Sequence, residues 1–392
     1  MEIGVVIIFI AFLVIVAPFI STLTRIPIVV VEMLLGAFGA YLGILGNFEI
    51  FKIVSQIGFL YLMFLAGMEV NLREFKMGKS SLLKRAIIYF VMLYTLAIVV
   101  TLYFNLSAVY IVTFPIFSLG ILMALVKEYG KNEPWLGLAL NIGIVGELIS
   151  ILAIAILSGS LESGFSVGFF INMLGLFIFL AIFVLVFKFA KVLFWWFPEL
   201  RVMLMPYHDN KDTDIRLSMA LMFSLVGLMM VLNVDKVLGA FLAGLFIRSF
   251  FKHKTDLPEK LSSFGFGFLV PIFFIYVGST LPLSVFLDKD ILLFALFISG
   301  TLFIIRLISS MTAYLTYFGF RNTLLFSLSD SMPLTFLVAI ATLAYNAGAI
   351  SNNEYYSFVV ASMINAVLFM IVIKILYQLF FKKNKNSTPT KP

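Results

Sequence analysis

Two charged residues of this 392-residue chain lie within apolar stretches, where a charge is costly and usually serves a function. Arg306 is near the middle of the stretch 291–317, and Glu147 belongs to the stretch 135–158. A guanidinium and a carboxylate together are far cheaper to bury in hydrocarbon than either group alone. The sequence therefore predicts that Glu147 is the partner of Arg306. In the alternative interpretation, the two residues form only a structural ion pair between two helices.

A carboxylate inside a membrane can bind either a proton or a small cation, and competition for a single site leads to exchange. Arginine does not release its proton in proteins, so Arg306 is expected to be a fixed counter-charge. Asp330 could add a second negative charge beside the starts of half-helices, whose dipoles are positive. Alternatively, Asp330 only binds backbone amides that a helix break leaves unpaired.

The elements that hold these residues are predicted to be membrane-spanning helices. Hydrophobic residues make up 62% of the chain, charged residues 12%, and apolar runs recur that match a hydrocarbon thickness of about 30 Å. Only helices and closed barrels satisfy their backbone groups in lipid. The predicted fold class is thus an all-α polytopic membrane protein with about 13 transmembrane helices. The predicted spans are 3–21, 27–45, 53–70, 82–104, 108–126, 135–158, 165–194, 214–232, 236–251, 262–281, 290–317, 322–345 and 355–381.

Basic residues predict the orientation of these spans. If the loops are numbered in order, the even-numbered loops contain only Lys52, Lys236 and Lys289. The odd-numbered loops, the adjoining span ends and the C-terminal tail contain the other basic residues outside the spans. Since cytoplasmic loops carry the excess of lysine and arginine, the N-terminus is expected outside the cell and the C-terminus inside. The protein is accordingly expected in the cell membrane, the inner membrane of a bacterium.

Several classes of function are not expected from this sequence. The chain has no cysteine, and its two histidines, His208 and His253, fall in predicted loops, without companions at metal-ligand spacing. Neither a nucleophile beside a histidine nor a glycine-rich phosphate loop is apparent, so an enzyme, a cofactor and a resident metal are not predicted. The net charge of +7 reflects membrane topology, and no nucleic-acid partner is expected. Residues 1–381 form the transmembrane domain, and 382–392 are expected to be a disordered cytoplasmic tail.

Two predicted spans contain a proline among hydroxyl groups. The first is the segment Thr113-Phe-Pro-Ile-Phe-Ser-Leu-Gly120, with Pro115 and Ser118, and the second is Ser327-Leu-Ser-Asp-Ser-Met-Pro-Leu-Thr335, with Pro333. Proline disrupts the preceding helical turn, so both spans are expected to be broken near Pro115, Gly120 and Pro333. The two prolines occupy matching places in two halves of the hydropathy pattern, in the fifth and the twelfth predicted spans. Because this offset of seven spans is odd, the two halves are expected to be inverted repeats. Inverted repeats with paired broken helices indicate the substrate site of a secondary transporter.

Four segments, in their order along the chain, resemble the Kef-like branch of the cation:proton antiporters. They are Arg25-Ile-Pro27 leading to Glu32-Met-Leu-Leu-Gly36, Phe64-Leu-Ala-Gly-Met-Glu-Val-Asn-Leu-Arg73, Leu238-Gly-Ala-Phe-Leu-Ala-Gly244 and Val270-Pro-Ile-Phe-Phe-Ile-Tyr-Val-Gly278. The resemblance implies a sodium/proton antiporter-like fold and a homodimer. It further implies a core domain, formed by residues of about 82–158 and 290–381, that moves like an elevator against the dimerisation helices.

The chain departs from this family at the expected ion site. Many members carry two adjacent aspartates where this chain has Gly146-Glu147, and a serine-threonine pair where it has Ser118-Leu119. Arg306 stands where many electrogenic relatives carry a lysine, and Asp330-Ser-Met-Pro333 differs from the Pro-Arg-Gly-Glu of many relatives. One carboxylate and one oxygen ligand are therefore missing from the family pattern.

The resulting expectation is a secondary transporter that exchanges Na⁺ or K⁺ for H⁺ by an electroneutral elevator mechanism. Its ion- and proton-binding residues would be Glu147, Asp330 and Ser118, with Arg306 compensating charge and Glu32 and Asn141 lining a possible cavity. Two alternatives remain open at this point. One is an ion leak or channel, and the other is a transport-inactive relative that acts as a sensor.

Overall fold

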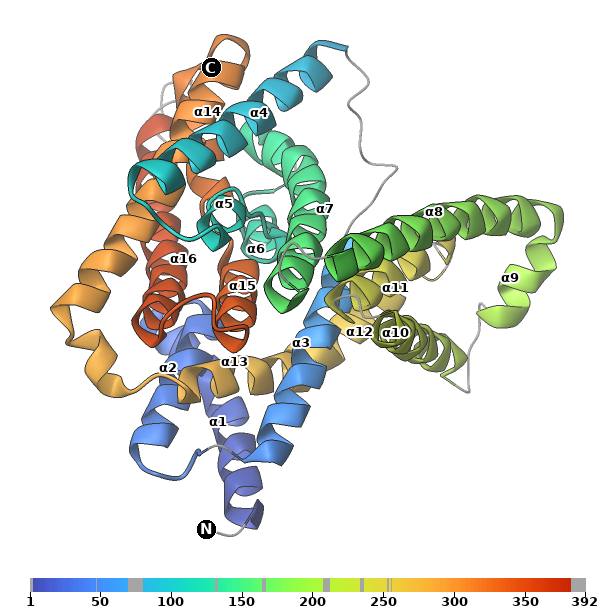
Figure 1. Cartoon of the computed structure of the whole chain (residues 1–392), viewed down its shortest axis with the longest axis horizontal. Helices are drawn as coiled ribbons and strands as arrows, with labels where there is room; N and C mark the ends of the chain where they lie inside the picture. The colour runs from blue at the N-terminus through green and yellow to red at the C-terminus, as the bar shows by residue number, and fades with distance from the viewer. Residues whose placement is uncertain are drawn as a thin grey trace, which may run out of the picture. The chain divides into compact units, whose positions relative to one another are not determined.

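The computed structural model describes residues 3–46, 48–69, 80–130, 133–163, 167–206, 212–232, 236–251, 254 and 256–381. Within these ranges every regular element is helical (Figure 1). The α-helices are α1 (Ile3–Thr24), α2 (Ile28–Tyr41), α3 (Glu49–Glu69), α4 (Ser80–Tyr103), α5 (Val109–Thr113), α6 (Leu119–Tyr129), α7 (Pro134–Ser163), α8 (Val167–Trp196), α9 (Pro198–Leu204), α10 (Thr213–Val231), α11 (Lys236–Phe250), α12 (Leu257–Phe264), α13 (Val270–Ser279), α14 (Lys289–Asp330), α15 (Leu334–Asn346) and α16 (Asn352–Phe381). A π-helical turn at Gly265–Leu269 joins α12 to α13, and a 3₁₀ turn covers Leu283–Phe286.

Each of the thirteen predicted spans corresponds to helix in the structure. Among the described residues, nine helical stretches are individually long and apolar enough to cross a membrane. The stretch Lys289–Asn346 counts once among these nine but contains two predicted spans, 290–317 and 322–345. The other three spans are α2, α11, and the pair of short helices α5 and α6. The prediction of an all-helical polytopic protein is therefore confirmed.

Helix α14 consists of two helices that meet at Gly319. Gly319 has φ 74° and ψ 167°, a backbone conformation that glycine adopts easily and other residues rarely adopt. The side chain of Asp288 caps the first helix by accepting a hydrogen bond from Asp290 N at 2.9 Å. Beyond Gly319 a second helix runs to Asp330, so the predicted boundary between the spans 290–317 and 322–345 is correct.

The chain forms two compact units that alternate along the sequence. Unit 1 contains Met1–Arg73 and Ala155–Leu283, and unit 2 contains Glu74–Ile154 and Ser284–Pro392. In unit 1, helices α3 and α11 approach so closely that a Cβ atom on Gly244 would lie 2.0 Å from Phe64 O, and one on Gly67 would lie 2.1 Å from Phe241 O. Small residues permit such contacts between membrane helices, where dispersion forces and close packing stabilise the pair.

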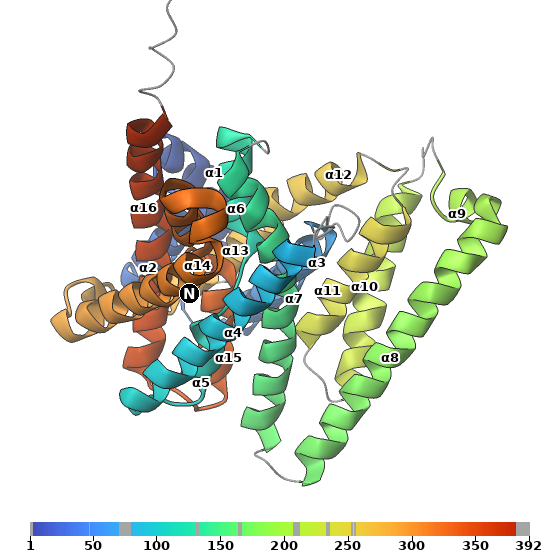
Figure 2. The ribbon, with the colours of Figure 1, turned by 90° about the horizontal axis from the view of Figure 1, so that it is seen from above.

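Unit 2 contains the interrupted helices. Helix α14 packs against α16 and α4, and α15 packs against α16. The short helices α5 and α6 lie between α7 and α16 in both views (Figures 1 and 2). Apart from Glu32, all the candidate ion-site residues that the sequence analysis names belong to unit 2.

Candidate ion-binding site

Two interruptions in unit 2 form the centre of the candidate site. Helix α5 ends at Thr113 and α6 begins at Leu119, while α14 ends at Asp330 and α15 begins at Leu334. Pro115 lies in the first interruption and Pro333 in the second, as the sequence predicts. Gly120 was also expected at a break, but it lies in the first turn of α6 because the extended stretch ends at Ser118.

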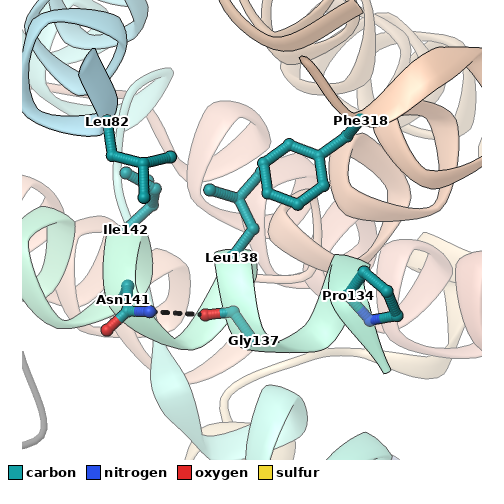
Figure 3. A pocket seen from close by; sticks show the side chains of 7 residues that line it. All are labelled: Leu82, Pro134, Gly137, Leu138, Asn141, Ile142 and Phe318. Atoms are coloured by element: carbon teal, nitrogen blue, oxygen red, sulfur yellow. Dashed lines mark hydrogen bonds between the residues drawn. The ribbon is translucent and has the colours of Figure 1, made fainter. Parts of the chain in front are cut away.

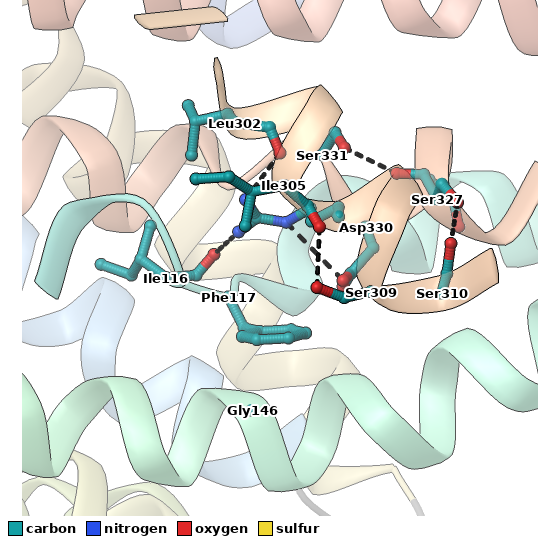
Figure 4. A network of polar contacts seen from close by, with 12 residues as sticks. Ile116, Phe117, Gly146, Leu302, Ile305, Ser309, Ser310, Ser327, Asp330 and Ser331 are labelled. Atoms are coloured by element: carbon teal, nitrogen blue, oxygen red, sulfur yellow. Dashed lines mark hydrogen bonds and ion pairs between the residues drawn. The ribbon is translucent and has the colours of Figure 1, made fainter. Parts of the chain in front are cut away.

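Arg306 of α14 binds the backbone of the first interruption. Its side chain is fully buried, and its Nη1 atom donates to Phe114 O at 2.7 Å and to Leu302 O at 3.3 Å. Its Nη2 atom donates to Ile116 O (Figure 4). Phe114 and Ile116 lie in the interruption, where carbonyls lack intrahelical partners, and the planar guanidinium has enough donors to reach both of them at once. Arg306 thus stabilises the unwound segment between α5 and α6.

Asp330 is the last residue of α14, directly before the second interruption. In the described part of the chain it is the carboxylate that forms an ion pair with Arg306. Its Oδ2 atom lies 3.6 Å from Arg306 Nε and also accepts a hydrogen bond from the hydroxyl of Tyr89 in α4. Asp330 is only 8% exposed. A buried carboxylate with an arginine and a phenol as partners has its charge largely compensated inside the protein.

The prediction that Glu147 is the ion-pair partner of Arg306 is therefore wrong. Arg306 pairs with Asp330, and its hydrogen bonds go to backbone carbonyls. The physical reason is the turn at Gly319: the second helix of α14 returns beside the first, as the contact between the hydroxyls of Ser310 and Ser327 shows, and brings Asp330 next to Arg306. The suggestion that Asp330 merely binds freed backbone amides does not describe these contacts either.

Glu147 lies on α7 and reaches the start of α6 instead. The carboxylate is 1% exposed, and its Oε1 atom accepts from Leu119 N at 3.4 Å. Leu119 is the first residue of α6, where backbone N–H groups lack intrahelical partners and the helix dipole favours negative charge. Glu147 is thus placed at the start of a half-helix, where the helix dipole favours a negative charge.

Gly146 allows the unwound segment to approach α7. A Cβ atom on Gly146 would lie 2.3 Å from the ring of Phe117, whose aromatic face also lies under the guanidinium of Arg306 at 5.5 Å (Figure 4). Ser150, one turn further along α7, accepts from Phe117 N at 2.9 Å and donates to Gly146 O at 2.7 Å. The space that a side chain at position 146 would need is therefore occupied by the ring of Phe117.

Ser118 meets a hydroxyl group from the other interruption. Its Oγ atom lies 2.6 Å from Oγ1 of Thr335, in the first turn of α15. Ser118 has extended backbone angles, φ −151° and ψ 128°, and its side chain does not cap α6. The two half-helices α6 and α15 therefore start at the same place, with one hydroxyl each.

Sequence reasoning missed Tyr89, Ser150 and Thr335 as members of this site. Each of them contributes a single hydroxyl group from a mainly apolar helix, and such a group gives no periodic signal in the sequence. Thr335 stands two residues after Pro333, so its position in the expected break was the one available indication.

Asn141 lines a cavity of about 170 Å³ in unit 2, near the start of α7 (Figure 3). Its amide nitrogen donates to Gly137 O at 2.9 Å, and the other lining residues are Leu82, Pro134, Gly137, Leu138, Ile142 and Phe318. Glu32 is buried on α2 in unit 1. The roles of Asn141 and Glu32 in ion movement stay predictions.

Other predictions fall outside the described residues. His208, His253 and the tail 382–392 belong to this group, as do the basic residues Lys79 and Lys211.

A multi-pass helical membrane protein whose two broken helices meet at buried charges has the architecture of a secondary transporter. The family described as "Sodium/hydrogen exchanger, transmembrane" matches residues 8–379 of the chain. The protein therefore belongs to the sodium/hydrogen exchanger family, within the cation:proton antiporter superfamily. Membership of its Kef-like branch stays a prediction.

Two relatives bear Na(+)/H(+) antiporter names. YjbQ of Bacillus subtilis (strain 168) is 27% identical over 381 residues, which cover 90% of this chain and 59% of YjbQ. Antiporter 3 of Methanocaldococcus jannaschii is 26% identical over 359 residues, 88% of each protein. The chain thus spans somewhat over half the length of YjbQ.

The fold is similar to that of a solved sodium proton antiporter, MjNhaP1 from Methanocaldococcus jannaschii at pH 8. The TM-score is 0.67 at 15% sequence identity, over 96% of this chain and 97% of that one. This likeness confirms the predicted sodium/proton antiporter-like fold.

Proposed function

We propose that this protein exchanges a monovalent cation, Na⁺ or K⁺, for H⁺ across the cell membrane, with Glu147 as the group that carries either ion. The observation that supports this role most directly is the position of Glu147: a buried carboxylate at the start of α6, beside the hydroxyl-bearing residue Ser118. A carboxylate and neutral oxygen atoms are suitable ligands for a hard cation, and the same carboxylate can bind a proton when the cation leaves.

Charge compensation supports a simple stoichiometry. Arg306 and Asp330 form an ion pair of zero net charge, and Arg306 keeps its proton. Glu147 then carries the charge that changes, so that one proton replaces one monovalent cation. Alternating access of the elevator type, with unit 2 moving as the core domain, and a homodimer are parts of the same proposal and follow from the family resemblance.

The direct experiment is proton flux in proteoliposomes with the purified wild-type protein. Na⁺, K⁺ or Li⁺ is added on one side, and internal pH is followed with a fluorescent dye. Saturable, cation-dependent proton movement is expected. Its absence with all three cations would remove the exchanger proposal and favour a transport-inactive relative, whereas cation flux without coupled proton movement would favour a channel.

Exchange is expected to be insensitive to membrane potential, because no net charge crosses the membrane in a cycle that replaces one monovalent cation by one proton. Initial rates in proteoliposomes clamped at zero potential, and at a potential negative inside, should be equal within error. The clamp uses an ionophore for an ion other than the transported cation. A rate that rises with the imposed potential would require a second titrating group, and Asp330 is the residue that would then be tested.

The orientation can be tested by cysteine labelling, which is direct because the chain contains no cysteine. Glu259, an exposed residue of α12, lies beside the basic residue Lys260, and Lys289 is exposed at the start of α14. Glu259→Cys should react with an impermeant maleimide only from the cytoplasmic side, and Lys289→Cys only from outside. Lys254 is unsuitable for this purpose because it is 4% exposed and lies 3.4 Å from Asp214. Reaction of both cysteines from one side would contradict the topology.

A further inference from the structure

We propose that the hydroxyl of Thr335 is a cation ligand and that, with Ser118, it forms a pair of oxygen ligands contributed by the two broken helices. This inference rests on the exchange proposed above and extends its site to a residue of α15. The geometry that supports it is the distance of 2.6 Å between Ser118 Oγ and Thr335 Oγ1.

Thr335 differs from other threonines of this chain in the partner of its hydroxyl. Within a helix, a threonine hydroxyl usually donates to the carbonyl four residues earlier. Seven threonines of the described chain do so, at distances of 2.7–2.8 Å: Thr22, Thr24, Thr101, Thr113, Thr312, Thr323 and Thr342. Thr335 instead directs its hydroxyl across to Ser118, because the residues before it are not helical.

The pair retains the capacity to bind an ion. A hydroxyl group has one donor hydrogen and two acceptor lone pairs, so one hydrogen bond between two hydroxyls leaves lone pairs on both oxygen atoms. Thr335 is 8% exposed, and the hydroxyl of Ser118, the N-cap residue of α6, is not used in a capping hydrogen bond. In an apolar surrounding, lone pairs of this kind are suited to replacing part of the hydration shell of a monovalent cation.

Glu147 supplies the negative charge next to this pair. Its Oε1 atom lies 3.4 Å from the backbone nitrogen of Leu119, the residue that directly follows Ser118. Two helix starts repel a cation unless a carboxylate is present, so the hydroxyl pair alone is not a cation site. Together, Glu147, Ser118 and Thr335 provide one charged and two neutral oxygen ligands.

Thr335 also accounts for the departure from the family pattern at position 119. The sequence has Ser118-Leu119 where a serine-threonine pair is frequent in the resembling family, which removes one oxygen from α6. Leu119 packs instead toward Gly143 of α7, where a Cβ atom would lie 2.8 Å from Leu119 Cδ2. The oxygen lost from one broken helix is thus supplied by the other.

The experiment compares three variants in reconstituted proton-flux assays: Thr335→Val, which keeps the shape but removes the hydroxyl, Thr335→Ser, which keeps the hydroxyl, and the control Thr342→Val. Thr342 lies on the same helix, and its hydroxyl is bonded to Val338 O. Loss of one ligand to a charged ion is expected to raise the half-saturating Na⁺ concentration about tenfold or more in Thr335→Val. Thr335→Ser and Thr342→Val should stay near the wild-type value.

A second readout distinguishes ligation from a structural tie between the half-helices. Removal of an ion ligand should change the ratio of the half-saturating Li⁺ and Na⁺ concentrations, whereas a purely structural tie would lower thermal stability and leave that ratio unchanged. If Thr335→Val does not fold, Ser118→Ala tests the same pair and should raise the half-saturating Na⁺ concentration in the same direction.

This inference alone would be overturned if the wild type is active and Thr335→Val keeps the wild-type half-saturating Na⁺ and Li⁺ concentrations. If Thr335→Val is unfolded, the same result in Ser118→Ala would overturn it. A wild type without cation-dependent proton movement would overturn the proposed exchange itself. The two failures are therefore distinguishable in one set of liposomes.

Discussion

Glu147→Gln is expected to reduce cation-dependent proton movement to the background of protein-free liposomes. Glutamine has nearly the same shape and can still accept a hydrogen bond from Leu119 N through its amide oxygen. It is uncharged, however, so it cannot take up a proton, and it offers a cation no negative charge. Because the substitution removes a buried charge without creating a cavity, the protein should still fold. Proton flux measures the activity, and thermal unfolding in detergent measures the fold.

Glu133→Gln is the matched control for this variant. Glu133 lies just before α7 and accepts a hydrogen bond from the hydroxyl of Tyr377 at 2.7 Å, which a glutamine oxygen can also accept. Its exchange rate should equal that of the wild type. Wild-type exchange in Glu147→Gln would refute Glu147 as the carrier, and the same substitution series would then be applied to Asp330.

Arg306→Met is expected to be the most destabilising of the substitutions considered for unit 2. It removes the donors to Phe114 O and Ile116 O and leaves Asp330 as a buried carboxylate with only Tyr89 as a described partner. Breaking a buried ion pair by removing one partner costs about 3–5 kcal/mol of unfolding free energy. The midpoint of thermal unfolding in detergent should fall steeply, and little folded protein should be recovered.

Two comparisons separate the ion pair from the backbone contacts. In Arg306→Met/Asp330→Asn, the stranded charge is gone, so the double variant should be more stable than Arg306→Met alone, although the carbonyls remain without their donors. Arg85→Ala is the control for the loss of an arginine. Arg85 lies at the more exposed end of α4 and, like Arg306, donates a hydrogen bond to a backbone carbonyl, Ala313 O. Its cost should be about 1 kcal/mol.

A double variant no more stable than Arg306→Met would show that the Asp330 charge contributes little. An Arg306→Met protein as stable as Arg85→Ala would contradict the role of Arg306 at the interruption.

The amino-acid sequence by itself determined the membrane-spanning helices and the location of both interruptions. Hydrophobic runs long enough to cross a bilayer specify helices, since no other open structure satisfies its backbone in lipid. Proline disrupts the helix in which it lies, so Pro115 and Pro333 indicated the two breaks without knowledge of the helices that pack around them. These are local effects, and for that reason they can be deduced from a single chain.

Only the tertiary structure decided which groups meet at those interruptions. Composition indicated that Arg306 needs a carboxylate, but the rotation of each helix about its axis places Asp330 beside it and directs Glu147 toward α6. The contact of Ser118 with Thr335 joins residues 217 positions apart, so its formation depends on the packing of α15 against α6. In an apolar helix the hydrophobic pattern is nearly the same on all faces, and the neighbours of a single polar side chain are therefore set by close packing between helices, which the sequence does not display.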